Sequence, residues 1–265
     1  MYIRSDDIQL YYEKLGAGFP VVLLHPFPVH HEFWKPITAR LSSRYQLLLP
    51  DLRAHGLSDV GKGTATMAKH AEDLKHLLDA EQLVRAVFVG VSIGGYILFE
   101  FWRKHRGRVQ ALVLSSTRAE ADTEQGRANR LKSIEDSRLH GTAPFLDAQM
   151  QVLIGESTRR NHPEIAAQAR RMMEKMTVSG FVAVQLGMAE RPDSVADLRD
   201  IDVETLVIAG EEDTLTPLAN AQVIQQHIGA ARLSVIPKGG HYAAFENPTE
   251  FARVLRQFLD GLKLS

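Results

Sequence analysis

The stretch VRAVFVGVSIGGYILFEFW, residues 84–102, decides how this chain folds. Its first seven residues form an apolar, β-branched run that predicts a buried strand, and YILFEFW is typical of a helix. Between the two runs, Gly90, Gly94 and Gly95 flank Ser92. A sharp turn from strand to helix brings backbone segments so close together that the flanking positions have no room for side chains. The stretch therefore predicts a strand, a tight turn that projects the Ser92 hydroxyl, and a helix.

The same alternation of strands and helices continues on both sides of this stretch. Buried strands are expected at 20–25, 45–50, 84–90, 109–116, 206–210 and 232–237, after a short hairpin at 2–4 and 8–15. Helices are expected at 33–41, 66–79, from Ser92 onward, at 217–229, and after Asn247 as the helix cap. This order implies parallel strands joined by helical crossovers. We expect an α/β fold, with a mostly parallel, doubly wound sheet of about eight strands.

Residues 118–198 interrupt the alternation, because they contain several amphipathic helical patterns and no convincing strand. Helix starts are predicted at Pro144 and Pro163. This block indicates a helical cap inserted between two strands, which divides the chain into a core at 1–117, a cap at 118–198 and the rest of the core at 199–265. Most of the large apolar side chains in the block are expected to pack the cap onto the core: Met150, Met172, Met173, Met176, Phe181 and Met188.

Composition excludes several classes of function. The 265 residues carry 31 Lys and Arg against 32 Asp and Glu, a formal net charge of -1, which favours neither a nucleic-acid partner nor an anionic membrane surface. No apolar stretch is long enough to span a membrane, and the first residues lack the pattern of a signal peptide. The absence of cysteine excludes disulfides and thiolate metal sites. We expect a cytoplasmic protein.

Two further loops carry candidate partners for Ser92. His241 follows the expected strand at 232–237, and Asp213 follows the strand at 206–210, with Glu211 and Glu212 as neighbouring alternatives. Catalytic groups of open parallel sheets gather at the carboxyl ends of the strands. There, His241 can act as the base that takes the Ser92 proton, and Asp213 can hold the far ring nitrogen of that histidine. The pattern predicts a Ser92, Asp213 and His241 catalytic triad.

Five motifs in this order resemble the α/β-hydrolase superfamily, in its branch of serine esterases, cofactor-free haloperoxidase-like perhydrolases and lactonases. They are LLHPFPVHHEFW (23–34), DLRAHGLSD (51–59), GVSIGG (90–95), GEEDTLTP (210–217) and GGHYAAFENP (239–248). The chain departs from the family at Pro26 and Ala54, where glycine is usual. The motifs are specific for the superfamily and uninformative about the substrate.

The resemblance implies further assignments. The backbone NH groups of Phe27 and Ile93 would form the oxyanion hole, and Phe27-Pro28 is a candidate cis peptide. The loop that holds Asp51, Arg53, His55 and Ser58 is expected to be structural. His30 and His31 are interpreted as pocket lining or surface residues, not as metal ligands. The residues expected to line the substrate pocket are Trp34, Met150, Leu215 and Met188.

The resulting expectation is a serine hydrolase that cleaves small, largely apolar carboxylic esters or lactones through an acyl-enzyme on Ser92. It needs no cofactor and no metal, and its partner is a small-molecule substrate; the sequence leaves monomer or homo-oligomer undetermined. The alternatives are a perhydrolase or haloperoxidase-like enzyme and a carbon-carbon bond hydrolase with the same triad. An alternative from a different functional class is a ligand-sensing protein on the same scaffold.

Overall fold

The computed structural model describes residues 1–264 and places eight strands of this range in one sheet. The strands are β1 (Tyr2–Ser5), β2 (Ile8–Leu15), β3 (Phe19–Leu24), β4 (Tyr45–Pro50), β5 (Ala86–Val91), β6 (Val109–Ser115), β7 (Thr205–Gly210) and β8 (Ala231–Ile236). Their order is β1-β2-β4-β3-β5-β6-β7-β8, with β1-β2 and β2-β4 antiparallel and every other pair parallel. The predicted α/β fold with a mostly parallel sheet is therefore confirmed.

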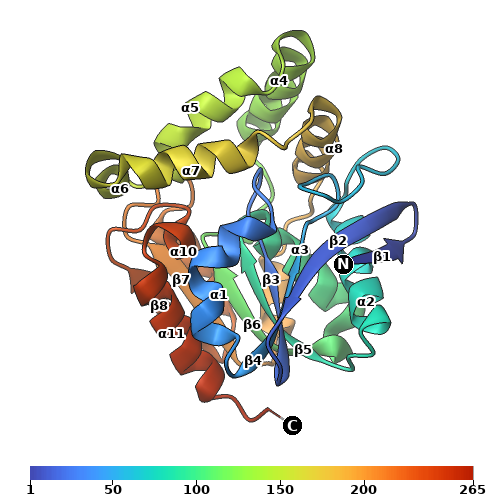
Figure 1. Cartoon of the computed structure of the whole chain (residues 1–265), viewed down its shortest axis with the longest axis vertical. Helices are drawn as coiled ribbons and strands as arrows, with labels where there is room; N and C mark the ends of the chain where they lie inside the picture. Colours follow the sequence, from blue (N-terminus) through green and yellow to red (C-terminus); the bar gives the residue numbers. More distant parts are fainter. Residues whose placement is uncertain (265) are drawn as a thin grey trace.

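Helices cover both faces of the sheet (Figure 1). One face packs against α1 (Lys35–Leu41), α10 (Ala243–Glu246) and α11 (Pro248–Asp260), and the other against α2 (Met67–Ala80), α3 (Ile93–His105) and α9 (Leu218–His227). Side chains alternate between the two faces along each strand. In β3, Val21 and Leu23 belong to the core beside α11, whereas Val22 and Leu24 belong to the core beside α3. Three short 3-10 helices lie at His31–Trp34, Arg106–Arg108 and Ala196–Asp200.

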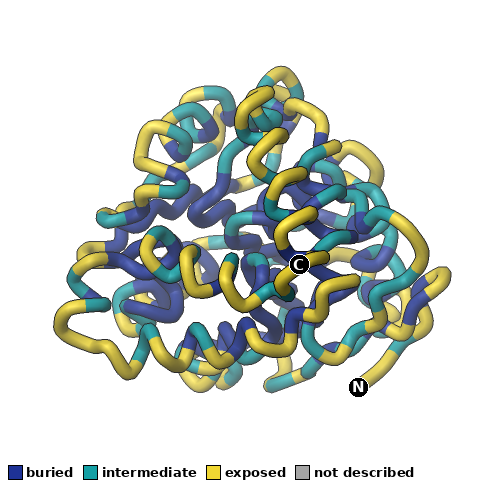
Figure 2. Tube along the Cα trace, turned by 90° about the horizontal axis from the view of Figure 1, so that it is seen from above, coloured by how far each residue is buried: buried dark blue, intermediate teal, exposed yellow. Residues whose placement is uncertain are grey.

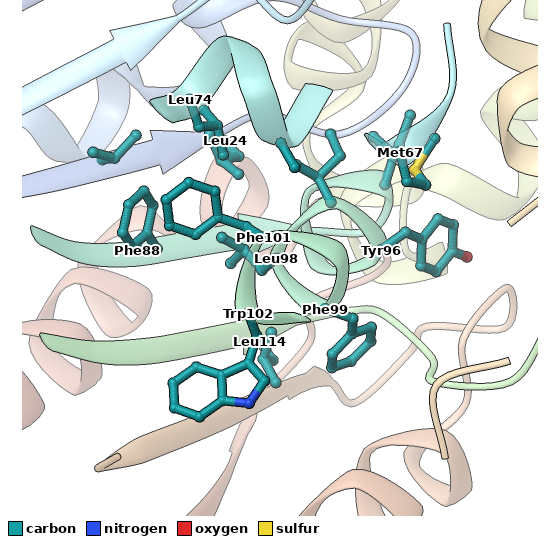
Figure 3. Packing of buried hydrophobic residues seen from close by; sticks show 14 of the residues in the cluster. Leu24, Met67, Leu74, Phe88, Tyr96, Leu98, Phe99, Phe101, Trp102 and Leu114 are labelled. Atoms are coloured by element: carbon teal, nitrogen blue, oxygen red, sulfur yellow. The ribbon is translucent and has the colours of Figure 1, made fainter. Parts of the chain in front are cut away.

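The core beside α3 holds β5 and its following helix together. Phe88 of β5 and Phe101 of α3 have ring centroids 4.7 Å apart, and both are fully buried (Figure 3). Buried residues form the interior of the molecule, and exposed residues are concentrated at its periphery (Figure 2). The helix expected to begin at Asn247 is confirmed, because the Asn247 side chain accepts a hydrogen bond from the Glu250 NH at 3.3 Å. That helix ends at Asp260.

Five helices lie between β6 and β7 in the chain, and we call them the cap: α4 (Glu124–His140), α5 (Ala143–Leu153), α6 (Glu156–Asn161), α7 (Pro163–Met173) and α8 (Val178–Ala189). They sit together above one edge of the sheet (Figure 1). The helices predicted at Pro144 and Pro163 correspond to α5 and α7. No helix within residues 1–264 combines the length and apolar character that crossing a membrane requires.

Helix α8 contacts the core so closely that two of its glycines have no room for a side chain. A Cβ on Gly187 would lie 1.9 Å from the Ala65 carbonyl oxygen, and one on Gly180 would lie 2.7 Å from the Ala54 carbonyl oxygen. The Ala65 NH also donates a hydrogen bond to the Ala183 carbonyl at 3.0 Å. Backbone contact therefore fixes this end of the cap on the core.

We predict that Gly187→Ala lowers the free energy of unfolding by about 1 to 3 kcal/mol, because a methyl group cannot enter the contact without moving α8. Urea denaturation measures the change. Gly107→Ala is the matched control, because a Cβ there meets nothing within 4 Å. Equal stability of the two variants would contradict the close contact.

Candidate active site

The backbone at Ser92 has the sharp turn that the glycine pattern predicts. Strand β5 ends at Val91, α3 begins at Ile93, and Ser92 between them has φ 56 and ψ -113. A Cβ on Gly90 would lie 2.6 Å from the Gly94 carbonyl carbon, and one on Gly95 would lie 2.4 Å from Thr117 Oγ1. The glycines are therefore required by space, and the turn leaves the Ser92 side chain partly exposed.

The acid loop and the histidine loop meet as expected. His241 Nδ1 lies 3.0 Å from Asp213 Oδ2, and both side chains are buried. Thr216 supports the carboxylate: its hydroxyl donates to Asp213 Oδ2 at 2.6 Å and its NH to Oδ1 at 2.9 Å. The alternatives are occupied elsewhere, since Glu211 accepts from the Lys238 NH and Glu212 from the Ser157 NH. The structure thus pairs His241 with Asp213.

Charge and hydrogen bonding favour the ionised form of Asp213. Burial opposes ionisation, but the nearby His241 and the hydrogen bonds from His241 and Thr216 outweigh it, so the pKa of Asp213 lies below its ordinary value. An ionised carboxylate accepts a hydrogen bond from Nδ1–H of His241, which leaves Nε2 as the acceptor.

Ser92 and His241 line the same cavity, which has a volume of about 320 Å³. His241 Nε2 is buried and has no hydrogen-bond partner within the described range, so Ser92 Oγ is not yet bonded to it. Catalytic hydrogen bonds are often long before substrate binds and shorten in the complex. The structure therefore brings the serine and the histidine to one cavity without forming the hydrogen bond between them.

The predicted oxyanion donors lie beside this cavity. Ile93 follows Ser92 at the start of α3, where the first NH groups of a helix have no internal partner, and Phe27 lines the cavity. Within residues 1–264, neither of these NH groups donates a hydrogen bond. The Phe27-Pro28 peptide is cis. The Tyr242 hydroxyl, which the sequence did not single out, donates to the Phe27 carbonyl at 3.0 Å and so holds this loop in place.

The predicted pocket residues divide into two groups. Leu215 and Met188 line the cavity, but Trp34 and Met150 do not. The prediction for Trp34 is wrong because its ring is fully buried in the core, where it packs against Phe33 and Phe251. The prediction for Met150 is wrong because its side chain packs against the core cluster on the α11 side.

The cavity is also more polar than the sequence suggested. Its lining includes Arg118, Asp122 and Arg130, where we expected few charges. Arg118 lies two residues after the expected strand at 109–116, so its position near the carboxyl end of a strand could have indicated a place in the cavity wall. Arg130 comes from α4 of the cap and Asp122 from the segment just before α4, and the sequence pattern does not give the orientation of either.

The 51–59 loop lies outside the cavity lining and is held by its own hydrogen bonds. Asp51 Oδ1 lies 2.7 Å from both the NH and the Nδ1 of His31, and Asp51 Oδ2 accepts from the Leu57 NH at 2.7 Å. Arg53 forms a buried ion pair with Asp73 at 2.8 Å. These contacts agree with a structural loop.

His30 and His31 are neither surface residues nor part of the cavity lining, so that interpretation was wrong. Both are buried, and ligand atoms of His30, His31 and Asp51 lie within 4.8 Å of one another. However, Asp51 Oδ1 accepts hydrogen bonds from both the NH and the Nδ1 of His31. Neither this oxygen nor this ring nitrogen is therefore free to bind a metal. The arrangement fits a hydrogen-bonded support better than a metal site.

A second carboxylate, also missed from the sequence, ties the cap to the histidine loop. Glu246 is buried and accepts hydrogen bonds from the Gly240 NH at 3.0 Å and from the Gly155 NH, between α5 and α6, at 2.8 Å. Burial raises the pKa of Glu246 to about 6, against the opposing effect of these hydrogen bonds. This side chain joins the loop that carries His241 to the cap above it.

Comparison with known proteins adds three relatives of similar length. The family described as "alpha/beta hydrolase fold" matches residues 20–248. A malate-bound thermophilic esterase from Thermogutta terrifontis is 35% identical, with a TM-score of 0.95 over 98% of this chain and 97% of that one. The 3-oxoadipate enol-lactonase 1 of Acinetobacter baylyi is 25% identical over 92% of this chain and 89% of its own length. A putative non-heme chloroperoxidase of Synechocystis is 28% identical over 97% and 96%.

Buried neutral histidines should make the fold sensitive to acid. Burial lowers the pKa of His55 to about 4, and its ring lies edge-on to Phe27, 5.8 Å between centroids. Because the unfolded chain binds this proton near pH 6.5 and the folded chain only near 4, His55 favours folding at neutral pH, and this contribution is lost as the pH falls from 6.5 to 4.

We therefore predict that His55→Asn reduces the loss of unfolding free energy between pH 6.5 and 4 by up to about 3 kcal/mol. Chemical denaturation at a series of pH values gives this slope. Comparison of slopes removes any pH-independent effect of the substitution, and parallel curves for the two proteins would contradict the prediction.

Proposed function

Because the chain belongs to the α/β-hydrolase family, we propose that it hydrolyses small carboxylic esters or lactones through an acyl-enzyme on Ser92. One observation carries the proposal. Ser92 and His241 line one cavity, with His241 Nδ1 held 3.0 Å from Asp213 and Nε2 left without a partner among the described residues. The relatives described as an esterase and an enol-lactonase support the same reaction class.

The reaction proceeds in two halves. As Ser92 Oγ attacks the substrate carbonyl, its proton passes to His241 Nε2, and His241 then gives this proton to the alcohol that leaves. Water enters the same position and gives a proton to His241 as it attacks the acyl-enzyme, which releases the acid and restores Ser92. Asp213 stabilises the imidazolium that forms in both halves.

The oxyanion of each tetrahedral intermediate accepts hydrogen bonds from the NH groups of Phe27 and Ile93. The loss of one such donor costs on the order of 3 kcal/mol of transition-state stabilisation. Pro26 has no NH to give, but the donor here is the next residue, so the proline leaves the oxyanion hole intact. Tyr242 supports it by holding the Phe27 carbonyl.

A cavity of about 320 Å³ suits a small-molecule substrate. Its charged lining argues against the largely apolar substrates that we first expected, and that restriction is dropped. The proposed chemistry uses side chains and backbone only, so it needs neither a cofactor nor a metal. We place the enzyme in the cytoplasm, as its composition suggested.

Peroxide chemistry is the second candidate, and two observations favour it. Pro28 follows the proposed oxyanion residue and lines the cavity, a feature that resembles perhydrolases, and one relative is described as a putative non-heme chloroperoxidase. In this reaction hydrogen peroxide replaces water in attacking the acyl-enzyme. Carbon-carbon bond hydrolysis would use the same triad, and a ligand-sensing protein would turn substrate over only slowly.

We predict that Ser92→Ala lowers kcat for p-nitrophenyl esters by roughly a thousandfold or more, because no other group replaces the nucleophile. An organofluorophosphonate should label the unmodified protein once, at Ser92, as read by peptide mass mapping. Ser116→Ala, at the end of the neighbouring strand, is the matched control and should keep full activity and labelling. Retention of more than a few per cent of activity by Ser92→Ala would remove Ser92 from the mechanism.

A substrate panel separates the candidate reactions. We expect kcat/KM for p-nitrophenyl esters to exceed both the rate of peracid formation from acetate and peroxide and the rate of cleavage of vinylogous diketones. A rapid burst of alcohol release would distinguish an enzyme from a ligand sensor. Faster turnover of peroxide or diketone would replace ester hydrolysis as the assigned reaction, while Ser92, Asp213 and His241 would keep their proposed roles.

A further inference from the structure

We propose that the substrate carries an ionised carboxylate in addition to its scissile ester or lactone bond, and that Arg118 binds this carboxylate. The inference rests on the proposed function and names the substrate class of that site. It follows from the position of one guanidinium group, from the absence of a counter-charge beside it, and from the other charges of the cavity wall.

Arg118 lies between the nucleophile and the acid loop. It follows Thr117, whose hydroxyl donates to the Ser92 carbonyl at 2.8 Å. Its own Nη2 donates to the carbonyl of Leu215, two residues after Asp213. Arg118 lines the cavity together with Ser92 and His241. One hydrogen bond to the acid loop therefore orients the guanidinium at the wall of the proposed active site.

The charge of Arg118 is not neutralised by the protein. Within residues 1–264, no carboxylate forms an ion pair with its guanidinium, and Nε is buried without a hydrogen-bond partner. The single bond to Leu215 leaves most of its five N–H donors free of protein acceptors. A half-buried cation with unused donors is costly to desolvate, and a bound anion would remove that cost.

The other charges of the wall do not supply this anion. Asp122 is the one carboxylate of the described cavity lining, and it is already shared by two arginines, Arg130 at 2.5 Å and Arg191 at 2.7 Å. Arg130 also donates to Gln185 at 2.7 Å. Glu120 lies outside the lining and gives its backbone carbonyl to Arg191. The described lining thus carries two guanidinium groups, Arg118 and Arg130, against one carboxylate, and that carboxylate is already paired with Arg130 and Arg191, so the charge of Arg118 is left over.

A carboxylate is the anion that suits this site. A planar guanidinium binds a carboxylate through charge-assisted hydrogen bonds with defined geometry, which fixes the orientation of a small substrate. The carboxylate takes no part in bond changes: water cleaves the ester at the carbonyl, and the second carboxylate leaves unchanged with the acid or the alcohol. Its effect is to place the scissile carbonyl against Ser92.

The test compares charged and neutral esters of matched size. The charged probes are p-nitrophenyl hemiesters of succinic, glutaric and adipic acid, with the carboxylate on the acyl side, and 4-acetoxybenzoate, with it on the leaving-group side. The neutral partners are the corresponding methyl esters. We expect the unmodified enzyme to prefer at least one charged probe, and Arg118→Met to reduce that preference roughly tenfold or more in kcat/KM, mainly through KM.

Two matched variants separate charge recognition from damage to the acid loop. Arg118→Lys keeps a cation and should retain part of the preference, whereas Gln149→Met removes a polar lining residue without removing charge and should leave the ratio unchanged. An equal loss for charged and neutral probes in Arg118→Met would overturn the proposal, because it would show that Arg118 only supports the loop. A preference for neutral esters in the unmodified enzyme would overturn it as well.

Binding to Ser92→Ala distinguishes this inference from the proposed reaction. Calorimetry with the preferred hemiester should show binding that Arg118→Met in the same background weakens roughly tenfold. If Ser92→Ala still hydrolyses the probe, the acyl-enzyme proposal fails. If it is inactive yet binds charged and neutral probes equally, the carboxylate inference fails and the reaction stands.

Discussion

The hydrogen bond between His241 Nδ1 and Asp213 Oδ2 is the interaction on which the proposed chemistry depends. It places the ring proton on Nδ1, which leaves Nε2 free to accept a proton from the cavity side. Asp213 can do this only while it is ionised, and the ionised form is favoured by the nearby His241 and by the hydrogen bonds from the Thr216 hydroxyl and NH. A neutral or displaced acid would leave His241 without a fixed tautomer and Ser92 without a base.

The rest of the fold brings three loops from distant parts of the chain to this bond. The loops after β5, β7 and β8 carry Ser92, Asp213 and His241, and parallel strands place them at one edge of the sheet. Backbone contacts hold the cap above that edge, and Glu246 joins it to the histidine loop. Because cap and core both contribute to the cavity wall, the position of the cap determines which substrates fit.

The fold, and the placement of Ser92 and His241 at one cavity with Asp213 beside the histidine, could be predicted because their physical signals are local. Glycines beside Ser92 reflect backbone contacts at the turn, and apolar runs reflect strands buried on both faces, so both can be recognised within a few residues. The cavity wall could not be predicted in the same way. Trp34 and Met150 were expected to line the pocket, but Trp34 is buried in the core beside α11, and Met150 of α5 packs against the outside of that core.

The same limit explains the other misses. His30 and His31 are polar, yet the fold buries both, and only for His31 does a hydrogen bond to Asp51 account for it. The sequence did not indicate that Arg118, Asp122 and Arg130 line one cavity, because they are brought together only by the position of the cap over the strand ends. Residues whose place is fixed by the end of a single strand could be predicted from the sequence, whereas a cavity wall built from both the cap and the core could not.

The most direct test of this account is the mass of the enzyme during turnover. Rapid acid quenching of the protein with a p-nitrophenyl ester, followed by intact mass measurement and peptide mapping, should reveal one acyl group per chain, attached to Ser92 and formed with the initial release of p-nitrophenol. Full turnover with no covalent adduct, or an adduct on any other residue, would contradict it.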